Sequence, residues 1–162
     1  MIFSIGHGGR TLESLVADLR RYEITYVVDV RSVPYSRHQP AFQARPLQAE
    51  LTARDITYVY LGDALGGRPD DPACYGPDGA VDYARCRARP AFQRGLERLQ
   101  SAEAQALRLC LMCAEGKPAD CHRARLIGAA LADLGIAVAH ILPDGSLVSQ
   151  AALIQPAQRA LF

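Results

Sequence analysis

The chain has 162 residues, of which 49% are hydrophobic and 22% are charged, and its formal net charge is +1. These values are typical of a globular protein with one core, and they indicate neither disorder nor a strong electrostatic attraction to nucleic acids or membranes. The longest apolar stretch begins at Ile127 and is interrupted by Asp133 and Gly135, so it is too short to span a bilayer. The N-terminal residues lack the pattern of a secretion signal, and an odd number of cysteines without compact disulfide spacing favours a reducing compartment. We therefore expect a cytoplasmic protein with a single domain over residues 1–162 and no membrane contact.

Short apolar runs alternate with amphipathic segments along the chain. From the N-terminus we expect a strand at 2–5, a helix at 11–22 capped by Thr11, a strand at 26–30, a helix at 47–54 and a strand at 57–61. We then expect a helix at 91–102, a strand at 107–113, a helix at 121–134 ended by Gly135, a strand at 137–142, and a last helix from about residue 146 that is kinked near Pro156. Residues 31–42 and 62–72 contain too many prolines, glycines and polar side chains for regular structure. This alternation predicts a single three-layer α/β domain, with a mostly parallel sheet of about five strands flanked by helices.

Polar and charged side chains follow four of the predicted strands. The carboxyl ends of parallel strands share one edge of a sheet, and open α/β sheets bind ligands in the crevice at that edge. We therefore expect one site there, built from His7 and Arg10, from Asp29 and Arg31, from residues 62–68, and from residues 113–123.

The segment 107–127 is the most informative, because a buried strand runs into a polar loop that holds two cysteines, two acidic residues, a histidine and two arginines. Cys110 and Cys113 are three positions apart on the strand, so their sulfur atoms should face opposite sides and Cys110 should lie in the core. Cys113 lies at the strand end, near a helix start and Arg123, which is a setting that lowers a thiol pKa and favours the nucleophilic thiolate.

Two other interpretations of this loop stay open. Cys113, Cys121, His122 and Glu115 carry the side chains of a metal site, although their spacing matches no familiar zinc finger. Alternatively, both cysteines are small buried hydrophobic residues, and Glu115 forms a structural ion pair with Arg123.

The other segments also allow both functional and structural roles. His7 either belongs to the site or hydrogen-bonds a loop carbonyl beside the glycines of its turn. Asp29 and Arg31 either face one ligand or form an internal ion pair that holds the loop. Arg37 either clamps an anion or is solvated. Residues 61–69, LGDALGGRP, lack the spacing of a phosphate-binding loop or a dinucleotide fingerprint, so they are expected to form a wall of the site.

Four segments together resemble the family called domain of unknown function 488. They are SIGHGGRT at 4–11, DVRSVPYSR at 29–37, YVYLGDALGGRP at 58–69 and CAEGKPADCHR at 113–123. The resemblance covers nearly the whole chain and implies a compact α/β domain, but it brings no established activity. A weaker similarity to rhodaneses and cysteine phosphatases concerns only a strand-end cysteine on an anion-binding loop, because the loop between Cys113 and Arg123 is longer than in those proteins. The family pattern falls on these positions: His7, Asp29, Arg31, Arg37, Gly62, Leu65, Gly66, Cys113, Glu115, Cys121, His122 and Arg123.

The residues favour an enzyme, a cysteine-dependent hydrolase or transferase, that acts on an anionic, phosphorylated or nucleotide-like substrate at the carboxyl edge of the sheet. The alternatives are a module that binds a nucleotide or nucleic acid without covalent chemistry, and a metal-binding domain that uses Cys113, Cys121 and His122. The sequence indicates no particular cofactor or oligomeric state. The candidate catalytic residues are Cys113 as nucleophile, His122 or His7 as acid–base group, and Asp29 or Glu115 as the group that orients it; the candidate ligand-binding residues are Arg31, Arg37, Arg123, Arg10 and Cys121.

Overall fold

The computed structural model of the protein describes residues 1–154. Within these residues, a six-stranded sheet runs through the molecule in the order β3-β2-β4-β1-β5-β6. β6 (Leu147–Ser149) pairs antiparallel with β5 at one edge, and all the other pairings are parallel. The predicted α/β architecture with a mostly parallel sheet is confirmed. The parallel strands are β1 (Ile2–Gly6), β2 (Tyr26–Asp29), β3 (Thr57–Tyr60), β4 (Leu109–Cys113) and β5 (Val138–Ile141).

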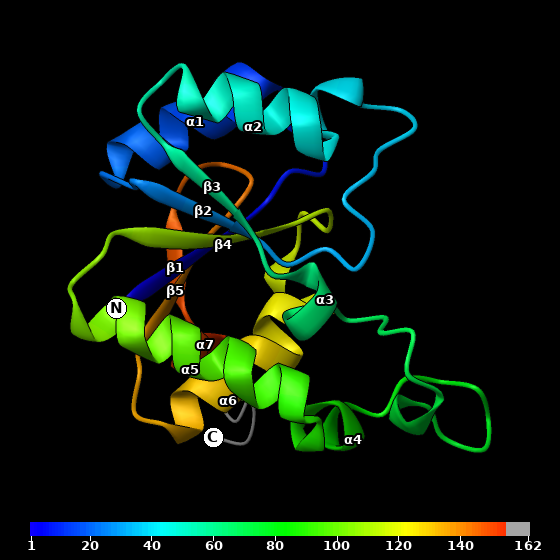
Figure 1. The fold of residues 1–162 in the computed structure, drawn as a ribbon. Helices are drawn as coiled ribbons and strands as arrows, with labels where there is room; N and C mark the ends of the chain where they lie inside the picture. The colour runs from blue at the N-terminus through cyan, green and yellow to red at the C-terminus, as the bar shows by residue number, and fades with distance from the viewer. Residues whose placement is uncertain (155–162) are drawn as a thin grey trace, which may run out of the picture.

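Helices cover both faces of the sheet and make the three layers (Figure 1). α1 (Leu12–Arg21) and α2 (Ala44–Thr52) pack on one face. α5 (Pro90–Ala104), the π-helix η4 (Arg123–Gly128) and α6 (Ala129–Asp133) pack on the other. No helix within residues 1–154 is both long and apolar enough to cross a lipid bilayer. The remaining helical segments are short: α3 (Gly62–Leu65), α4 (Tyr83–Ala88), α7 (Gln150–Ile154), and the 3-10 turns η1 (Pro40–Phe42), η2 (Pro72–Cys74) and η3 (Pro118–Asp120).

β4 is a central strand, and every one of its residues is buried. It lies between β1 and β2, with Cys113 in register with Gly6 and Met112 in register with Asp29. Cys110 belongs to the core on the α1 side of the sheet, whereas Cys113 belongs to the core on the α5 side. The prediction that the two sulfur atoms face opposite sides is therefore confirmed, as is the place of Cys110 in the core.

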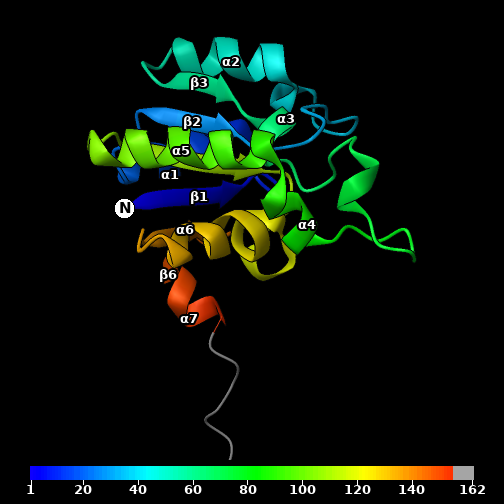
Figure 2. The same ribbon diagram turned by 60° about the horizontal axis from the view of Figure 1, so that its bottom comes forward.

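The strand order positions a crevice at the carboxyl ends of β2 and β4. These strands are neighbours, but α2, which follows β2, and η4 and α6, which follow β4, lie on opposite faces of the sheet. The chain segments that leave the two strand ends therefore diverge, and this divergence is the usual origin of a ligand crevice in an open α/β sheet. β3 and β6 form the outer edges of the sheet, with α7 beyond β6 (Figure 2).

The chain after β5 differs from the prediction. The sequence predicts a helix from about residue 146, whereas the structure forms the hairpin strand β6 and then α7. The N–H group of Gly145 donates to the carbonyl of Leu142 at 2.8 Å, and Gly145 has a φ of 81°, a conformation that favours glycine. The dipeptide Asp144-Gly145 is a hairpin signal that the helix prediction overlooked. The kink predicted near Pro156 lies outside the described residues.

The predicted helix after the cysteine loop is present, but its first half is the π-helix η4, which continues into α6. Gly135 follows with a φ of 73°, in agreement with its predicted role at the helix end. π-turns within helices occur frequently at functional sites. Here the π-turn begins with Arg123, whose side chain is fully buried. A second difference is that residues 62–72, predicted to be irregular, begin with the single helical turn α3.

Candidate functional site

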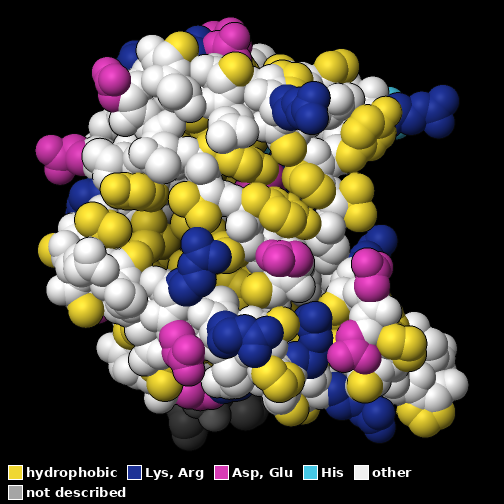
Figure 3. Space-filling model, in the orientation of Figure 1, with side chains coloured by type: hydrophobic (Ala, Val, Ile, Leu, Met, Phe, Trp, Pro, Cys, Tyr) yellow, Lys and Arg dark blue, Asp and Glu magenta, His cyan; other side chains and the backbone are white. Residues whose placement is uncertain are grey.

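A cleft of about 430 Å³ opens at the carboxyl edge of the sheet. The segment after β2 and the segment after α3 extend to the same side of the molecule (Figure 1), and the surface between them is concave (Figure 3). The cleft is lined from segments 31–35, 67–68, 113–115 and 120–122, and by Tyr83 of α4. Residues that follow β2, β3 and β4 thus come together here, whereas His7 and Arg10, which follow β1, are not among the lining residues.

Glycines after β1 allow the cysteine loop to approach the sheet closely. The N–H groups of His7 and Gly8 donate to the carbonyls of Cys113 and Ala114, each at 2.9 Å. A Cβ atom at Gly6 would lie 1.8 Å from a carbonyl oxygen of the loop. Because no side chain fits at such a distance, Gly6 is required by the packing of residues 113–116 on the turn after β1.

Arg123 lies beneath this loop and is fully buried. Its guanidinium donates to the Cys113 sulfur at 2.8 Å, to the Ser4 hydroxyl at 3.2 Å, and to the backbone carbonyls of Glu115 and Gly116. The predicted alternative of a Glu115–Arg123 ion pair is therefore wrong, because only the backbone of Glu115 contacts the guanidinium. Within residues 1–154, no carboxylate forms an ion pair with Arg123. A buried cation without an anion is costly, so this environment favours one thiolate within the cysteine pair that the guanidinium contacts.

The sulfur atoms of Cys113 and Cys121 lie 2.8 Å apart, and both thiols are free. The sulfur of Cys121 also accepts from the backbone N–H of Arg123 at 3.5 Å and lies 3.6 Å from Nδ1 of His122. The hydrogen bond from Cys113, assisted by His122, lowers the pKa of Cys121 even though burial opposes this shift. Burial raises the pKa of Cys113 well above its usual value. Sequence reasoning placed the low-pKa thiol at Cys113, and the structure corrects this to Cys121, because desolvation dominates at Cys113.

The backbone orients the ring of His122. Its Nε2 lies 2.9 Å from the carbonyl oxygen of Val30, and because a carbonyl can only accept, Nε2 carries the hydrogen. Nδ1, which faces Cys121, is therefore the nitrogen that can exchange a proton with the thiol. Gly67 packs against the ring, since a Cβ atom at Gly67 would lie 2.7 Å from Cγ of His122. The glycine segment after β3 thus forms a wall that holds His122.

A buried chain of hydrogen bonds supports Arg123 from behind. The hydroxyl of Ser4, which accepts from Arg123, donates to Nδ1 of His140 at 2.6 Å, and Nε2 of His140 donates to the amide oxygen of Gln150 at 2.6 Å. The amide nitrogen of Gln150 donates to the carbonyl of Ala124 at 3.0 Å, which fixes the direction of the whole chain. Burial lowers the pKa of His140, so the ring stays neutral, as this chain requires. Sequence reasoning missed these residues, although Ser4 and His140 are polar side chains inside apolar strands, which signals a buried hydrogen-bond network.

Arg31 lines the cleft, but Asp29 balances its charge. The guanidinium makes a bidentate contact with the Asp29 carboxylate, with Nε to Oδ1 at 2.9 Å and Nη2 to Oδ2 at 2.6 Å. The hydroxyl of Tyr58 donates to the same carboxylate at 2.7 Å. The sequence allows Asp29 and Arg31 either to face one ligand or to form an internal ion pair, and their geometry is that of an internal ion pair. Asp29 orients Arg31, and the described contacts do not join it to a histidine of the cleft.

His7 lies behind this ion pair. Nη1 of Arg31 lies 3.3 Å from Nε2 of His7, and Nδ1 of His7 contacts the side-chain oxygen of Gln39 at 3.1 Å. The ring stacks on Phe42 with centroids 4.4 Å apart. Burial, with a smaller effect of the Arg31 charge, lowers the pKa of His7. The ring nitrogens of His7 contact Gln39 and Arg31 and neither sulfur, so His122 is the histidine that faces the thiols.

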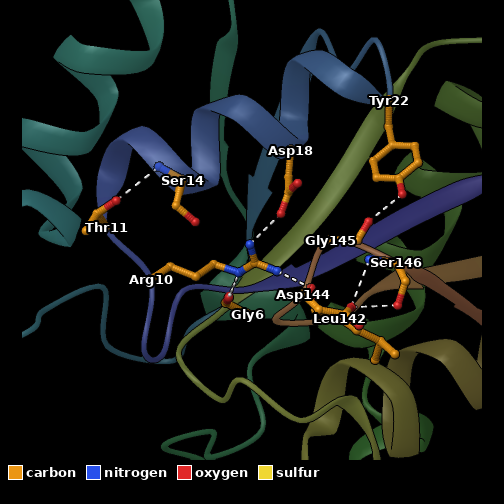
Figure 4. A network of polar contacts seen from close by, with 10 residues as sticks. All are labelled: Gly6, Arg10, Thr11, Ser14, Asp18, Tyr22, Leu142, Asp144, Gly145 and Ser146. Carbon is orange, nitrogen blue, oxygen red and sulfur yellow. Dashed lines mark hydrogen bonds and ion pairs between the residues drawn. The ribbon is translucent and has the colours of Figure 1, made fainter.

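Arg10 has a structural environment (Figure 4). It donates to the carbonyl of Gly6 at 3.0 Å, to the carboxylate of Asp18, and to the carbonyl of Leu142. These contacts tie the start of α1 to the turn after β5. They occupy the guanidinium with protein groups outside the cleft.

Arg37 and Glu115 are both exposed, but they differ in position. Arg37 does not line the cleft. Glu115 lies at the cleft, and its carboxylate accepts from the N–H of Lys117 at 3.1 Å. The carboxylate therefore shapes its own loop, and only the backbone carbonyl of Glu115 meets a sulfur, by accepting from the Cys113 thiol at 3.6 Å.

The sulfur separation also bears on the metal interpretation. A tetrahedral zinc ion holds two sulfur ligands about 3.8 Å apart, given Zn–S bonds of about 2.3 Å. The Cys113 and Cys121 sulfur atoms are 2.8 Å apart. Within residues 1–154, no group of three or more His, Cys, Asp or Glu side chains is arranged to hold a metal ion. The geometry fits a hydrogen-bonded thiol pair.

The sequence comparisons agree with the motifs that form the cleft. A family model described as Domain of unknown function DUF488 matches residues 11–130. This range contains the segments that supply the cleft, whereas the glycines after β1 precede it. No curated protein and no solved structure matches the chain. Because the family model covers well over half of its length, the chain belongs to the DUF488 family.

Proposed function

We propose that this protein is a cysteine-dependent hydrolase or transferase for an anionic, phosphorylated or nucleotide-like substrate. The observation that carries the proposal is the contact between the buried guanidinium of Arg123 and a thiol pair that lines a cleft. A buried arginine without a carboxylate partner stabilises anionic sulfur, and the thiolate is the nucleophilic form of cysteine.

Cys121 supplies the nucleophile in this proposal. Its thiolate attacks the electrophilic phosphorus or carbonyl carbon of the substrate, so a bond to sulfur forms and the bond to the leaving group breaks. Nδ1 of His122, which lies 3.6 Å from the sulfur, takes the proton of the Cys121 thiol when the thiolate forms and then gives this proton to the leaving oxygen. Water or an acceptor hydroxyl then displaces the sulfur and returns a proton to His122. Cys113 keeps Cys121 ionised by donating a hydrogen bond to it.

Arg68 is the side chain that we assign to substrate binding. It is exposed on the cleft wall, and it pairs with no carboxylate among residues 1–154, whereas the charge of Arg31 is already balanced. Glu115 and Asp120 line the same cleft and would repel a long polyanion. A small anionic group therefore suits the cleft better than the backbone of a nucleic acid.

The test is alkylation by iodoacetamide across pH, measured for each cysteine by mass spectrometry on folded, reduced protein with and without inorganic phosphate. We expect Cys121 to react with a midpoint below that of a free thiol, which is about pH 8.5, and we expect phosphate to slow the reaction. A midpoint at or above that of a free thiol refutes the proposal that Cys121 is the nucleophile. Absence of phosphate protection refutes the anion site.

Two arginine variants separate cleft binding from general electrostatics. Arg68→Ala should weaken protection by phosphate, whereas Arg37→Ala should leave it unchanged, because both arginines are exposed but only Arg68 lines the cleft. If both variants lose protection equally, phosphate acts through overall charge and Arg68 does not bind the substrate.

A further inference from the structure

We propose that Cys121 is also a site of oxidation by hydroperoxides, and that Cys113 converts the oxidised sulfur into a reversible Cys113–Cys121 disulfide. This inference describes how the activity of the same site is regulated, because the disulfide removes the Cys121 nucleophile. It rests on the proposed function only in sharing the Cys121 thiolate.

The first support is the proximity of the two sulfur atoms within one cleft. They lie 2.8 Å apart, so closing a disulfide bond of about 2.05 Å requires a movement of about 0.8 Å. Cys113 is held at the end of β4, whereas Cys121 lies in the irregular connection between η3 and η4. Both residues line the cleft although they are only 2% and 4% exposed. This arrangement admits a small oxidant such as hydrogen peroxide to the pair.

The second support is that the pair contains the two groups that disulfide formation by a hydroperoxide requires, a thiolate that reacts with the peroxide and a second thiol. The thiolate of Cys121 attacks one peroxide oxygen, so an S–O bond forms, the O–O bond breaks, and the departing hydroxide takes a proton to become water. The sulfur of Cys113 then attacks the sulfenic acid of Cys121, so an S–S bond forms and the S–O bond breaks. The second water leaves with the proton of Cys113. Two cysteines lose two electrons in total, and the hydroperoxide gains them.

Arg123 makes the disulfide easy to reduce. In the reduced site its guanidinium is 2.8 Å from the Cys113 sulfur, which in turn bonds the thiolate. In the disulfide no thiolate remains, so a buried cation loses its compensating anion. Because the reduced form is selectively stabilised, the pair has a higher reduction potential than a structural disulfide. The bond therefore acts as a reversible modification.

The chain contains its own control in a second cysteine pair. Cys86 of α4 is a neighbour of Cys74 of η2, and both side chains are buried. Burial, and then the neighbouring Cys74, raise the pKa of Cys86 to about 11. No arginine donates to either sulfur within the described residues, and neither residue lines the large cleft. Each of these thiols thus has a second buried thiol as a neighbour, as Cys113 and Cys121 do, but this pair lacks the arginine donor.

The experiment is a titration of the full-length, reduced protein with hydrogen peroxide at pH 7, followed by intact-mass and peptide mass spectrometry. We expect the mass of two hydrogen atoms to be lost at Cys113 and Cys121, at a rate about tenfold or more above any loss at Cys74 and Cys86. Dithiothreitol should restore the original mass. Equal rates for the two pairs, or no disulfide at Cys113 and Cys121, would overturn the proposal.

Two single variants identify the role of each sulfur. With Cys113→Ser, the sulfenic acid on Cys121 has no resolving thiol, so it should accumulate. The mass of the protein should rise by one oxygen atom, and the sulfenic acid should react with dimedone. With Cys121→Ser, neither the sulfenic acid nor the disulfide should form. An unreactive Cys121 in the Cys113→Ser variant overturns the order of steps. The alkylation test distinguishes this failure from that of the proposed function, because a Cys121 that alkylates at low pH but resists peroxide refutes only the oxidation.

Discussion

Replacing Arg123 by methionine tests the central electrostatic argument. The change keeps much of the aliphatic volume but removes a fully buried guanidinium that donates to four acceptors. Two of them, the carbonyls of Glu115 and Gly116, belong to a surface loop, where water can replace the arginine. The other two, the Ser4 hydroxyl and the Cys113 sulfur, are buried, so water cannot replace the lost donor, and their bonds to His140 and Cys121 remain. At about 1.5–3 kcal/mol for each hydrogen bond to a charged group, we expect Arg123→Met to lower the unfolding free energy by about 4 kcal/mol.

The assay is urea-induced unfolding under reducing conditions at pH 7, followed by far-ultraviolet circular dichroism because the chain contains no tryptophan. A loss of about 4 kcal/mol is a large part of the 5–15 kcal/mol that stabilises a typical domain. Arg123→Lys is the control: it keeps the cation but loses the forked donor geometry, so its loss should be intermediate. A loss below about 1 kcal/mol for Arg123→Met would refute the claim that this cation is held by buried acceptors. A lysine variant as unstable as the methionine variant would show that hydrogen-bond geometry, and not charge, holds the site.

Two further predictions concern the histidines. Gly67→Ala places a Cβ atom 2.7 Å from the ring of His122, so it should lower the free energy of urea unfolding by about 1–3 kcal/mol. It should also raise the pH midpoint at which iodoacetamide labels Cys121. An unchanged midpoint would contradict the role of the ring. Burial of both rings holds the folded-state pKa values of His7 and His140 below 6.5. The unfolded chain therefore binds protons more readily than the folded protein. The contribution of these rings to the unfolding free energy should be complete above pH 6.5 and should fall on acidification. The slope is at most about 1.4 kcal/mol per pH unit for each ring. His140→Gln should reduce this slope in urea titrations between pH 7 and pH 5, and an unchanged slope would show that His140 does not titrate on unfolding.

Much of the fold follows from local patterns. A strand of the observed sheet coincides, to within two residues at either end, with each of the apolar runs at residues 2–5, 26–30, 57–61, 107–113 and 137–142. The helix at 11–22 begins as predicted, with the Thr11 hydroxyl accepting from the N–H of Ser14 at 3.1 Å. β6 escaped prediction because it is short and half-exposed, so its hydrophobic pattern is weak and only the preceding turn marks it.

The contents of the candidate site were less predictable than its place. That the segments after β2, β3 and β4 would share one edge follows from parallel pairing, which the alternation of strands and helices already implies. The roles of the arginines do not follow, because an arginine after a strand carries the same local pattern whether it turns inward or outward. Arg10 holds α1 to the β5 turn, Arg31 is balanced by Asp29, and Arg123 turns under its own loop.

The sequence by itself determined the α/β class, the sheet edge at which the polar and charged residues gather, and the opposite orientation of Cys110 and Cys113. These features follow from hydrophobic patterns that repeat every two residues in a strand or about every four in a helix, and such patterns can be identified within one segment. Only the tertiary structure brings Cys121 to 2.8 Å from Cys113, where a hydrogen bond lowers the pKa of its thiol. That pKa depends on which donors surround the sulfur and how deeply each thiol is desolvated, and these are properties of contacts between segments. The same reason applies to Ser4 and His140, which meet across 136 positions of sequence only because β5 pairs with β1.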